Sequence, residues 1–233
     1  MIKRSILLAT LILLAALAVP AAGEPFRGYS PEGGYQYFTY GAYPQEEDGA
    51  ILPILWRILK QENGVLYAVS DAILEVGRID GDQWNFKGWA KSELFNRLNT
   101  DMLNTAFTAE EQAALQEDAE LGFISLPSAE DIKNPEFGFD TAKSRQLIGT
   151  PYALAQGLFH YSSRTYSPIW TRTQSTKPYA HRSTKVDGSV GFIGVEADDL
   201  GVLPVIWIQL NRIIIQSGSG TRAEPFVFVP AMP

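Results

Sequence analysis

The helical stretch over residues 92–115 most constrains the fold, because strand-like segments precede and follow it. Ser92 has the chemistry of an N-cap, and apolar residues follow it at helical spacing. Asn99 interrupts good helix formers, and Thr108 with Glu111 then forms the pattern of a capping box, which begins a second helix. We expect these helices to be core elements without a chemical role, because their apolar period is that of a buried face.

The strand-like segments lie at both ends of the chain. They are short runs of aromatic, β-branched and aliphatic residues, and Asn63-Gly64 between two of them is typical of a hairpin turn. The sequence predicts strands over 35–40, 51–59, 65–70, 122–126, 169–172 and 202–210, and a last hairpin over 212–216 and 225–229. Short helices are expected over 141–148 and from Pro151. Because helices and strands do not alternate as βαβ units, the pattern favours an α+β fold in a single loop-rich domain, with small antiparallel sheets formed by strands from both ends.

The N-terminus has the pattern of a secretory signal peptide, which we place at residues 1–23. Lys3 and Arg4 precede an apolar run over 6–19, and small residues follow. This run is shorter than the roughly 20 residues that span a bilayer, although an uncleaved anchor is the alternative. We expect a flexible leader over 24–35, a main domain over 36–210, and a C-terminal hairpin or tail over 211–233. The protein is then exported, to the periplasm, the cell surface or the medium.

Composition excludes several functions. The chain has no cysteine, which rules out disulfides, thiolate metal sites and cysteine nucleophiles, so stability must come from burial alone. Without Lys3 and Arg4 the formal net charge of −7 becomes −9. An acidic domain of this kind is a poor partner for nucleic acid, whose binding depends on neutralising phosphates.

Eight sequence blocks occur in an order that resembles a known family. They are Tyr40-Gly41-x-Tyr43-Pro44-Gln45, Pro53-Ile54-x-Trp56-Arg57-x-Leu59, Trp89 to Asn99, Phe107-Thr108-x-Glu110-Glu111, Thr150-Pro151-Tyr152-Ala153, Trp170-x-Arg172, Asp187-Gly188 and Gly201-Val202-x-Pro204-x-x-Trp207. Over roughly residues 36–210 the chain is similar to a bacterial domain of unknown function, the six-two-seven-three family of the DUF series. This resemblance implies a relative of the C-type-lectin-like and sulfatase-modifying folds, in which the first and last strands pair and long loops lie on one side.

Two positions depart from the family pattern. Thr171 and Thr173 flank Arg172 where the family usually has leucine and serine, and Leu203 stands where it usually has arginine. If that arginine serves a ligand or a loop in the family, this chain has lost or moved it. The cysteine-dependent oxidase chemistry of the sulfatase-modifying relatives is excluded here, because the chain has no cysteine.

The usual catalytic signatures are weak in this chain. His160 and His181 are the only histidines, and neither has a nearby acid in the sequence. Asp80 with Asp82, and the pair at 198–199, are oxygen-ligand candidates for Ca²⁺, but solvated turn acids are the simpler interpretation. Nothing marks the two spaced carboxylates of a glycosidase. We therefore predict no catalytic residue, no metal site and no cofactor.

One stretch, residues 141–186, stands out because it contains no acidic residue. It carries seven basic residues interleaved with aromatic ones, and loops of this kind suit anionic or sugar ligands. The predicted ligand-binding residues are Tyr152, Trp170, Arg172, His181 and Arg182. The alternative is that the rings are core and the basic residues are scattered over the surface.

From these observations we expect an exported, non-catalytic domain that binds a ligand, either an envelope glycan or a surface protein. The alternatives are a hydrolase of envelope polymers that uses carboxylates, and a purely structural or assembly protein. The hydrolase requires a cleft with two facing acids, and an assembly protein requires a large exposed apolar patch. We expect no nucleic-acid partner, and no membrane span once the signal peptide is removed.

Overall fold

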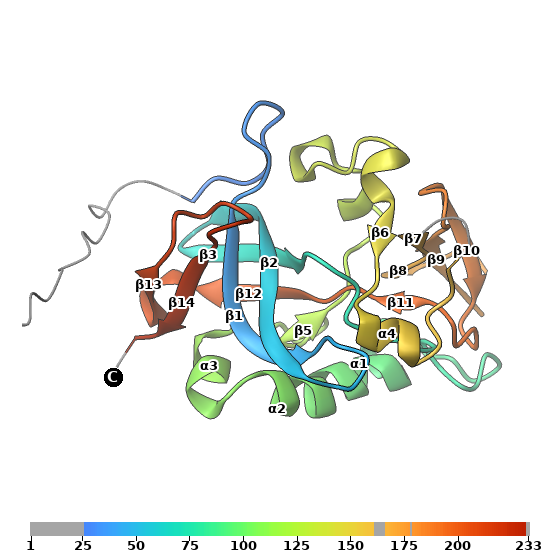
Figure 1. The fold of residues 1–233 in the computed structure, drawn as a ribbon. Coiled ribbons are helices and arrows are strands. Elements are labelled where there is room, and N and C mark those ends of the chain that lie inside the picture. The colour runs from blue at the N-terminus through green and yellow to red at the C-terminus, as the bar shows by residue number, and fades with distance from the viewer. Residues whose placement is uncertain (1–25, 161–165, 178, 232–233) are drawn as a thin grey trace, which may run out of the picture.

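The computed structural model describes residues 26–160, 166–177 and 179–231 of the chain. The fold is α+β, as predicted, with strands at both ends and the main helices between them (Figure 1). No helix in this described part is long and apolar enough to cross a membrane. The signal peptide expected at residues 1–23 lies outside the described residues and stays a prediction.

The main element is a seven-stranded sheet in the order β13-β14-β1-β2-β3-β12-β5. Its strands are β1 (Tyr37–Pro44), β2 (Ile51–Glu62), β3 (Val65–Ser70), β5 (Ile124–Ser125), β12 (Val205–Gln209), β13 (Ile213–Ser217) and β14 (Phe226–Pro230). Strands from both ends meet as expected, but in one larger mixed sheet rather than in small antiparallel sheets. The first and last strands, β1 and β14, pair in parallel, with Phe38 opposite Phe226.

Smaller sheets lie beside the main one. A three-stranded sheet has the order β10-β9-β8, and two-stranded sheets join β4 to β11 and β6 to β7. The bounds are β4 (Glu75–Val76), β6 (Leu147–Ile148), β7 (Tyr166–Ser167), β8 (Trp170–Gln174), β9 (Ala180–Thr184), β10 (Val190–Gly194) and β11 (Gly201–Val202). The prediction of a helix over 141–148 is wrong: only one 3₁₀ turn, Lys143–Arg145, forms before β6, which pairs with β7. The short helix α4 (Pro151–Ala155) is present, and the Thr150 side chain caps it.

The predicted helical stretch forms as two segments that cover one face of the main sheet. The first runs through α1 (Glu93–Arg97), a π-helical turn (Leu98–Met102) and α2 (Leu103–Ala106), and the second is α3 (Ala109–Ala114). Ser92 caps α1 by accepting a hydrogen bond from the Phe95 amide, and Thr108 with Glu111 forms a complete capping box. Both helix starts are therefore where the capping residues predicted them.

Asn99 explains the interruption of the first segment. Its Nδ2 donates to the carbonyl oxygens of Phe95, at 3.0 Å, and Ile124, at 2.9 Å. Its Oδ1 accepts from the amides of Phe123, at 2.7 Å, and Ile124, at 3.0 Å. The side chain thus joins the π-helical turn to β5, and the local loss of regular helix coincides with this connection.

The β2–β3 hairpin confirms the Asn63-Gly64 turn. Both residues have positive φ, 51° for Asn63 and 76° for Gly64, and Glu62 pairs with Val65 across the turn. Two consecutive left-handed residues match the right-handed twist of the strands, and asparagine and glycine adopt this conformation most readily.

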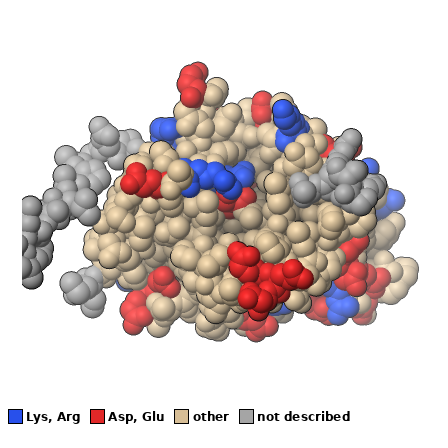
Figure 2. All heavy atoms as spheres, viewed as in Figure 1, with Lys and Arg blue, Asp and Glu red and all other residues tan. Residues whose placement is uncertain are grey.

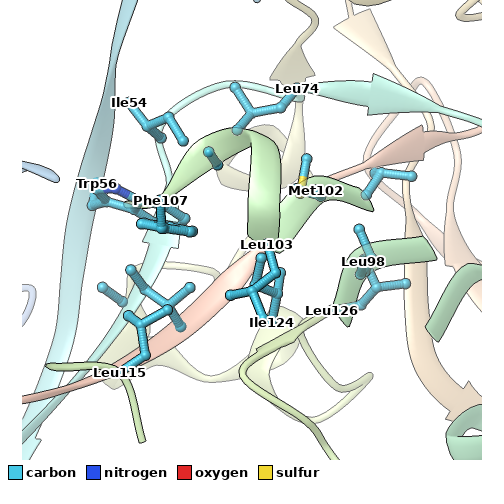
Figure 3. Packing of buried hydrophobic residues seen from close by; sticks show 14 of the residues in the cluster. Ile54, Trp56, Leu74, Leu98, Met102, Leu103, Phe107, Leu115, Ile124 and Leu126 are labelled. Carbon is cyan, nitrogen blue, oxygen red and sulfur yellow. The ribbon is translucent and has the colours of Figure 1, made fainter. Parts of the chain in front are cut away.

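Alternation along the central strands places apolar side chains on both faces of the sheet. Leu66 and Ala68 of β3 face the helices, while Tyr67 and Val69 face residues 127–158 on the other side. Figure 3 shows the helix-side cluster, in which side chains of the helices pack against those of the sheet; the labelled residues are Ile54, Trp56, Leu74, Leu98, Met102, Leu103, Phe107, Leu115, Ile124 and Leu126. Burial on both faces explains why these strands read as continuous apolar runs.

The segment expected to be a flexible leader is attached to the sheet from Phe26 onward. The ring of Phe26 packs edge-on against Phe226 and Phe228 of β14, and its amide donates to Gln61. Tyr35 donates its hydroxyl proton to the Phe137 carbonyl at 2.7 Å. Its aromatic residues therefore anchor the part of this segment that the structure describes.

Candidate functional site

Two of the five predicted ligand-binding residues are buried. Trp170 is fully buried in the helix-side cluster, and its Nε1 donates to the Gly77 carbonyl at 2.6 Å. His181 is also fully buried, with Nδ1 3.1 Å from the Thr171 carbonyl oxygen and its ring against Phe86. Burial lowers the pKa of His181. Both side chains pack inside the fold and cannot contact a ligand at the surface.

Arg172 has a structural partner. Its guanidinium donates to the Leu126 carbonyl and lies 3.2 Å from the Asp131 carboxylate, which also accepts from Tyr67. Only 18% of the Arg172 side chain is exposed. Arg145 behaves in the same way, because it donates to two backbone carbonyl oxygens. Some arginines of the acid-free stretch therefore donate hydrogen bonds to loop carbonyl oxygens, and not all of their donors face solvent.

The remaining two predicted residues lie apart. Tyr152 is half-buried in α4, where its ring meets that of Tyr43 edge-on with centroids 6.3 Å apart. Arg182 is half-buried on β9, opposite Phe192 of β10. The structure thus does not bring the five predicted residues together as one surface. Arg182 is the cross-strand neighbour of the exposed Phe192 of β10, and His181 that of Ile193, but the His181 side chain is fully buried.

The candidate calcium ligands are engaged in turns. Asp82 accepts from the amides of Trp84 and Asn85 and from the Asn85 side chain, and these bonds lower the pKa of Asp82. Asp80 accepts from the amides of Asp82 and Glu93. Within the described ranges, no group of three or more His, Asp or Glu side chains is arranged to hold a metal ion.

A half-buried polar cluster joins β1, β4 and α1. Tyr43 donates to the Glu75 carboxylate, and Arg97 reaches the same carboxylate at 3.4 Å. Burial raises the pKa of Tyr43, and the charge of Glu75 raises it further. The phenol therefore stays protonated over the physiological range and is a poor base. Its observed role is to connect β1, β4 and α1.

An exposed aromatic surface surrounds β10, the edge strand of the three-stranded sheet. Phe192 is 49% exposed and Ile193 37%, and Phe159 and Tyr179 are exposed to a similar degree. The Lys177 ammonium group lies 4.9 Å from the ring centroid of Phe192 and 5.9 Å from that of Tyr179. We call Phe159, Lys177, Tyr179, Phe192 and Ile193 the β10 surface.

The β10 surface borders a pocket of about 330 Å³. Its walls are mostly apolar, with Lys185 and Asp199 as the charged residues; the lining residues are Phe159, Pro168, Ser183, Thr184, Lys185, Val186, Phe192, Ile193, Asp199 and Leu200. The volume lies in the range of pockets that accept one large side chain or a small ligand group. A larger pocket of about 790 Å³ adjoins α3 and the end of β14. Its two acids, Glu110 and Glu111, both lie in the first turn of α3, and Glu111 is already used in the capping box.

The β10 surface is not evident from the sequence. Val190-Gly-Phe-Ile-Gly194 is a short apolar run that contains two glycines, and such a run predicts a buried strand as readily as an exposed one. The available signal was the lack of any charged residue or proline, which are the usual protection of an edge strand.

Comparisons with protein-family models, curated proteins and solved structures found no significant match to this chain. The resemblance to the six-two-seven-three family therefore rests on the sequence blocks alone. Function has to be inferred from the surfaces of the described residues.

Proposed function

We propose that this protein is an exported, non-catalytic domain of the C-type-lectin-like kind that binds a cell-envelope partner through the β10 surface. The signal-peptide pattern supports export, and the eight sequence blocks together with the pairing of the first and last strands support the fold assignment. The β10 surface replaces the five residues predicted from the sequence as the binding site. Arg182 is the one residue of that set that we retain beside it.

The observation that carries the proposal is the cluster of large apolar side chains exposed around one pocket. Burying such side chains would stabilise the fold, so leaving several exposed together is typical of an interaction site. Single exposed residues elsewhere, such as Ile214 of β13, need no such explanation.

Of the two ligand classes considered, the chemistry favours a segment of a surface protein over a glycan. The pocket walls are mostly apolar, whereas sugar hydroxyls require many polar partners. β10 is an uncharged edge strand, which is suited to pairing with an extended segment. The ammonium group of Lys177 adds a preference for acidic residues in that segment, whereas the charges of Lys185 and Asp199 in the pocket offset each other.

A binding assay with two probe sets tests this function. Extended peptides that alternate apolar and acidic residues form one set, and an envelope-glycan array forms the other. We expect peptide binding that Phe192→Ser weakens by roughly tenfold, because the loss of a central ring at a small interface is of that order. Ile214→Ser is the matched control, since Ile214 is 54% exposed on a different sheet. Peptide binding that is equal in both variants contradicts the assignment, and glycan binding that depends on Phe192 corrects the ligand class.

The hydrolase alternative receives less support. The acids at Asp80, Asp82 and Asp131 accept hydrogen bonds from backbone amides or neighbouring side chains, as structural carboxylates do. The Glu75 carboxylate is held between Tyr43 and Arg97. A hydrolase needs an acid and a base that face the same bond of the bound substrate. The carboxylates named here have separate structural roles instead.

A further inference from the structure

Two arginines converge on one buried carboxylate at the face of the main sheet that is opposite the helices. Arg57 of β2 donates from Nε to Asp71 Oδ1 at 2.6 Å and from its second nitrogen, Nη2, to the Asp71 carbonyl at 3.0 Å. Arg222, in the β13–β14 loop, donates from Nε and Nη2 to Asp71 Oδ2 at 3.0 and 2.8 Å. The Asp71 side chain is only 6% exposed, whereas that of Arg222 is 68% exposed.

The strand register places Tyr37 beside this cluster. Tyr37 is the cross-strand partner of Arg57, so both side chains lie on the same face. The Tyr37 amide donates to the carbonyl of Gly220, two residues before Arg222, which brings the loop next to the strand. The charges of Arg57, Asp71 and Arg222 all act on the Tyr37 hydroxyl, and burial raises the pKa of Tyr37.

The cluster has hydrogen-bond donors to spare. Among the described residues, Nη1 of Arg222 and the hydroxyl of Tyr37 have no hydrogen-bond partner. Two guanidinium groups and one carboxylate leave a local charge of about +1, in a chain whose net charge is −7. Figure 2 shows basic side chains over the upper part of the β1–β2 face, and acidic ones gathered at the turn between these strands.

We propose that Arg222, Tyr37 and Arg57 form a subsite for one oxyanion group, either a carboxylate or a sulfate or phosphate group. Asp71 holds both guanidinium groups in fixed positions, so little side-chain freedom is lost when the anion binds. The anion accepts from Nη1 of Arg222 and from the Tyr37 hydroxyl, and Arg57 adds its charge. This subsite is independent of the β10 surface, which lies on another sheet.

NMR titration of the arginine Nε–H resonances tests the subsite. Sulfate or acetate is added while chloride keeps the ionic strength constant. A second titration compares dextran sulfate with uncharged dextran, which distinguishes an anion carried by a polymer from a free anion. We expect saturable shifts at Arg57 and Arg222. Arg222→Gln weakens binding by roughly tenfold, because a charge-assisted hydrogen bond is lost.

Two further variants separate binding from a purely structural role. Tyr37→Phe removes a hydroxyl that has no hydrogen-bond partner among the described residues, so the midpoint of thermal unfolding stays unchanged while anion affinity falls by about threefold or more. Arg78→Gln is the matched control, because Arg78 is an exposed arginine paired through Nε with a single carboxylate, Glu93. It leaves binding unchanged. Shifts that rise without saturation, or equal affinity in wild type and Tyr37→Phe, overturn the proposal.

Discussion

The main sheet and the three-stranded sheet use apolar strands in opposite ways. In β3 and β12 of the main sheet, apolar side chains are buried on both faces, between the helices and residues 127–158. In β10, side chains of the same kind remain exposed beside a pocket. The first arrangement stabilises the fold, whereas the second contributes little to folding and remains available for binding. Apolar strands therefore have two roles in this protein. A strand that is covered on both faces stabilises the fold, and a strand whose side chains stay exposed is available for binding.

The largest expected effect is on the covered side of the main sheet. Trp56 is fully buried between Phe38 and Phe107, and its Nε1 donates to the Tyr40 carbonyl. Trp56→Ala should lower the free energy of unfolding by about 3–5 kcal/mol in chemical denaturation.

Trp207→Ala is the matched variant in the same sheet. Trp207 is only half-buried and stacks on Tyr67 with centroids 5.0 Å apart. We expect a loss of roughly half that of Trp56→Ala. A loss under about 1 kcal/mol for Trp56→Ala would show that the helix-side cluster does not stabilise the protein as described.

A smaller loss of stability is expected for Asn99, whose side chain joins the helical segment to the main sheet. Asn99→Ala leaves the amides of Phe123 and Ile124 without their side-chain acceptor, so we expect a loss of about 2–3 kcal/mol in urea denaturation. Asn104→Ala is the control on the same helical segment, because Asn104 is exposed and bonds only within the helix region. Equal losses would mean that the connection to β5 has no energetic importance.

The third effect depends on pH. Burial holds the pKa of His181 below its usual value of 6.5, so the unfolded chain binds more protons at this residue than the folded chain does. Stability from this residue is complete above pH 6.5 and falls as pH decreases toward the folded-state pKa, by at most about 1.4 kcal/mol at pH 5.5. The slope of unfolding free energy between pH 7.5 and 5.5 should be shallower in His181→Gln. An identical slope in both proteins would contradict the burial of this ring.

The smallest effect on stability is expected at the exposed strand. Phe192→Ser removes a half-exposed ring and its contact with Lys177, so the unfolding free energy should fall by less than about 1 kcal/mol. Calorimetry on this variant and on Ile214→Ser should give similar small shifts in the unfolding midpoint. A loss comparable to that of Trp56→Ala would place Phe192 in the core and would break the comparison between the two sheets.

Local chemistry made part of the fold predictable. Ser92, Thr108 with Glu111, and Asn63-Gly64 all act through neighbouring backbone atoms, so their roles can be read from a few residues. The parallel pairing of β1 with β14 was not predicted in its direction, because it depends on contacts between residues at opposite ends of the chain.

The candidate binding surface was harder to predict for the same reason. The positive charges of the acid-free stretch were visible in the sequence, but the carbonyl partners of Arg145 and Arg172 come from other segments. Exposure of Phe192 likewise depends on whether another layer covers β10. Only the three-dimensional arrangement separates a guanidinium group that supports a loop from one that faces solvent.

The parallel pairing of β1 with β14 has a consequence for biogenesis. Phe38 finds its neighbour only after the ribosome has added Phe226, so the central sheet stays open while almost all of the described chain is being made. Closing so long a segment is entropically slow. The nascent chain therefore cannot complete its main sheet until its C-terminal strand has been synthesised.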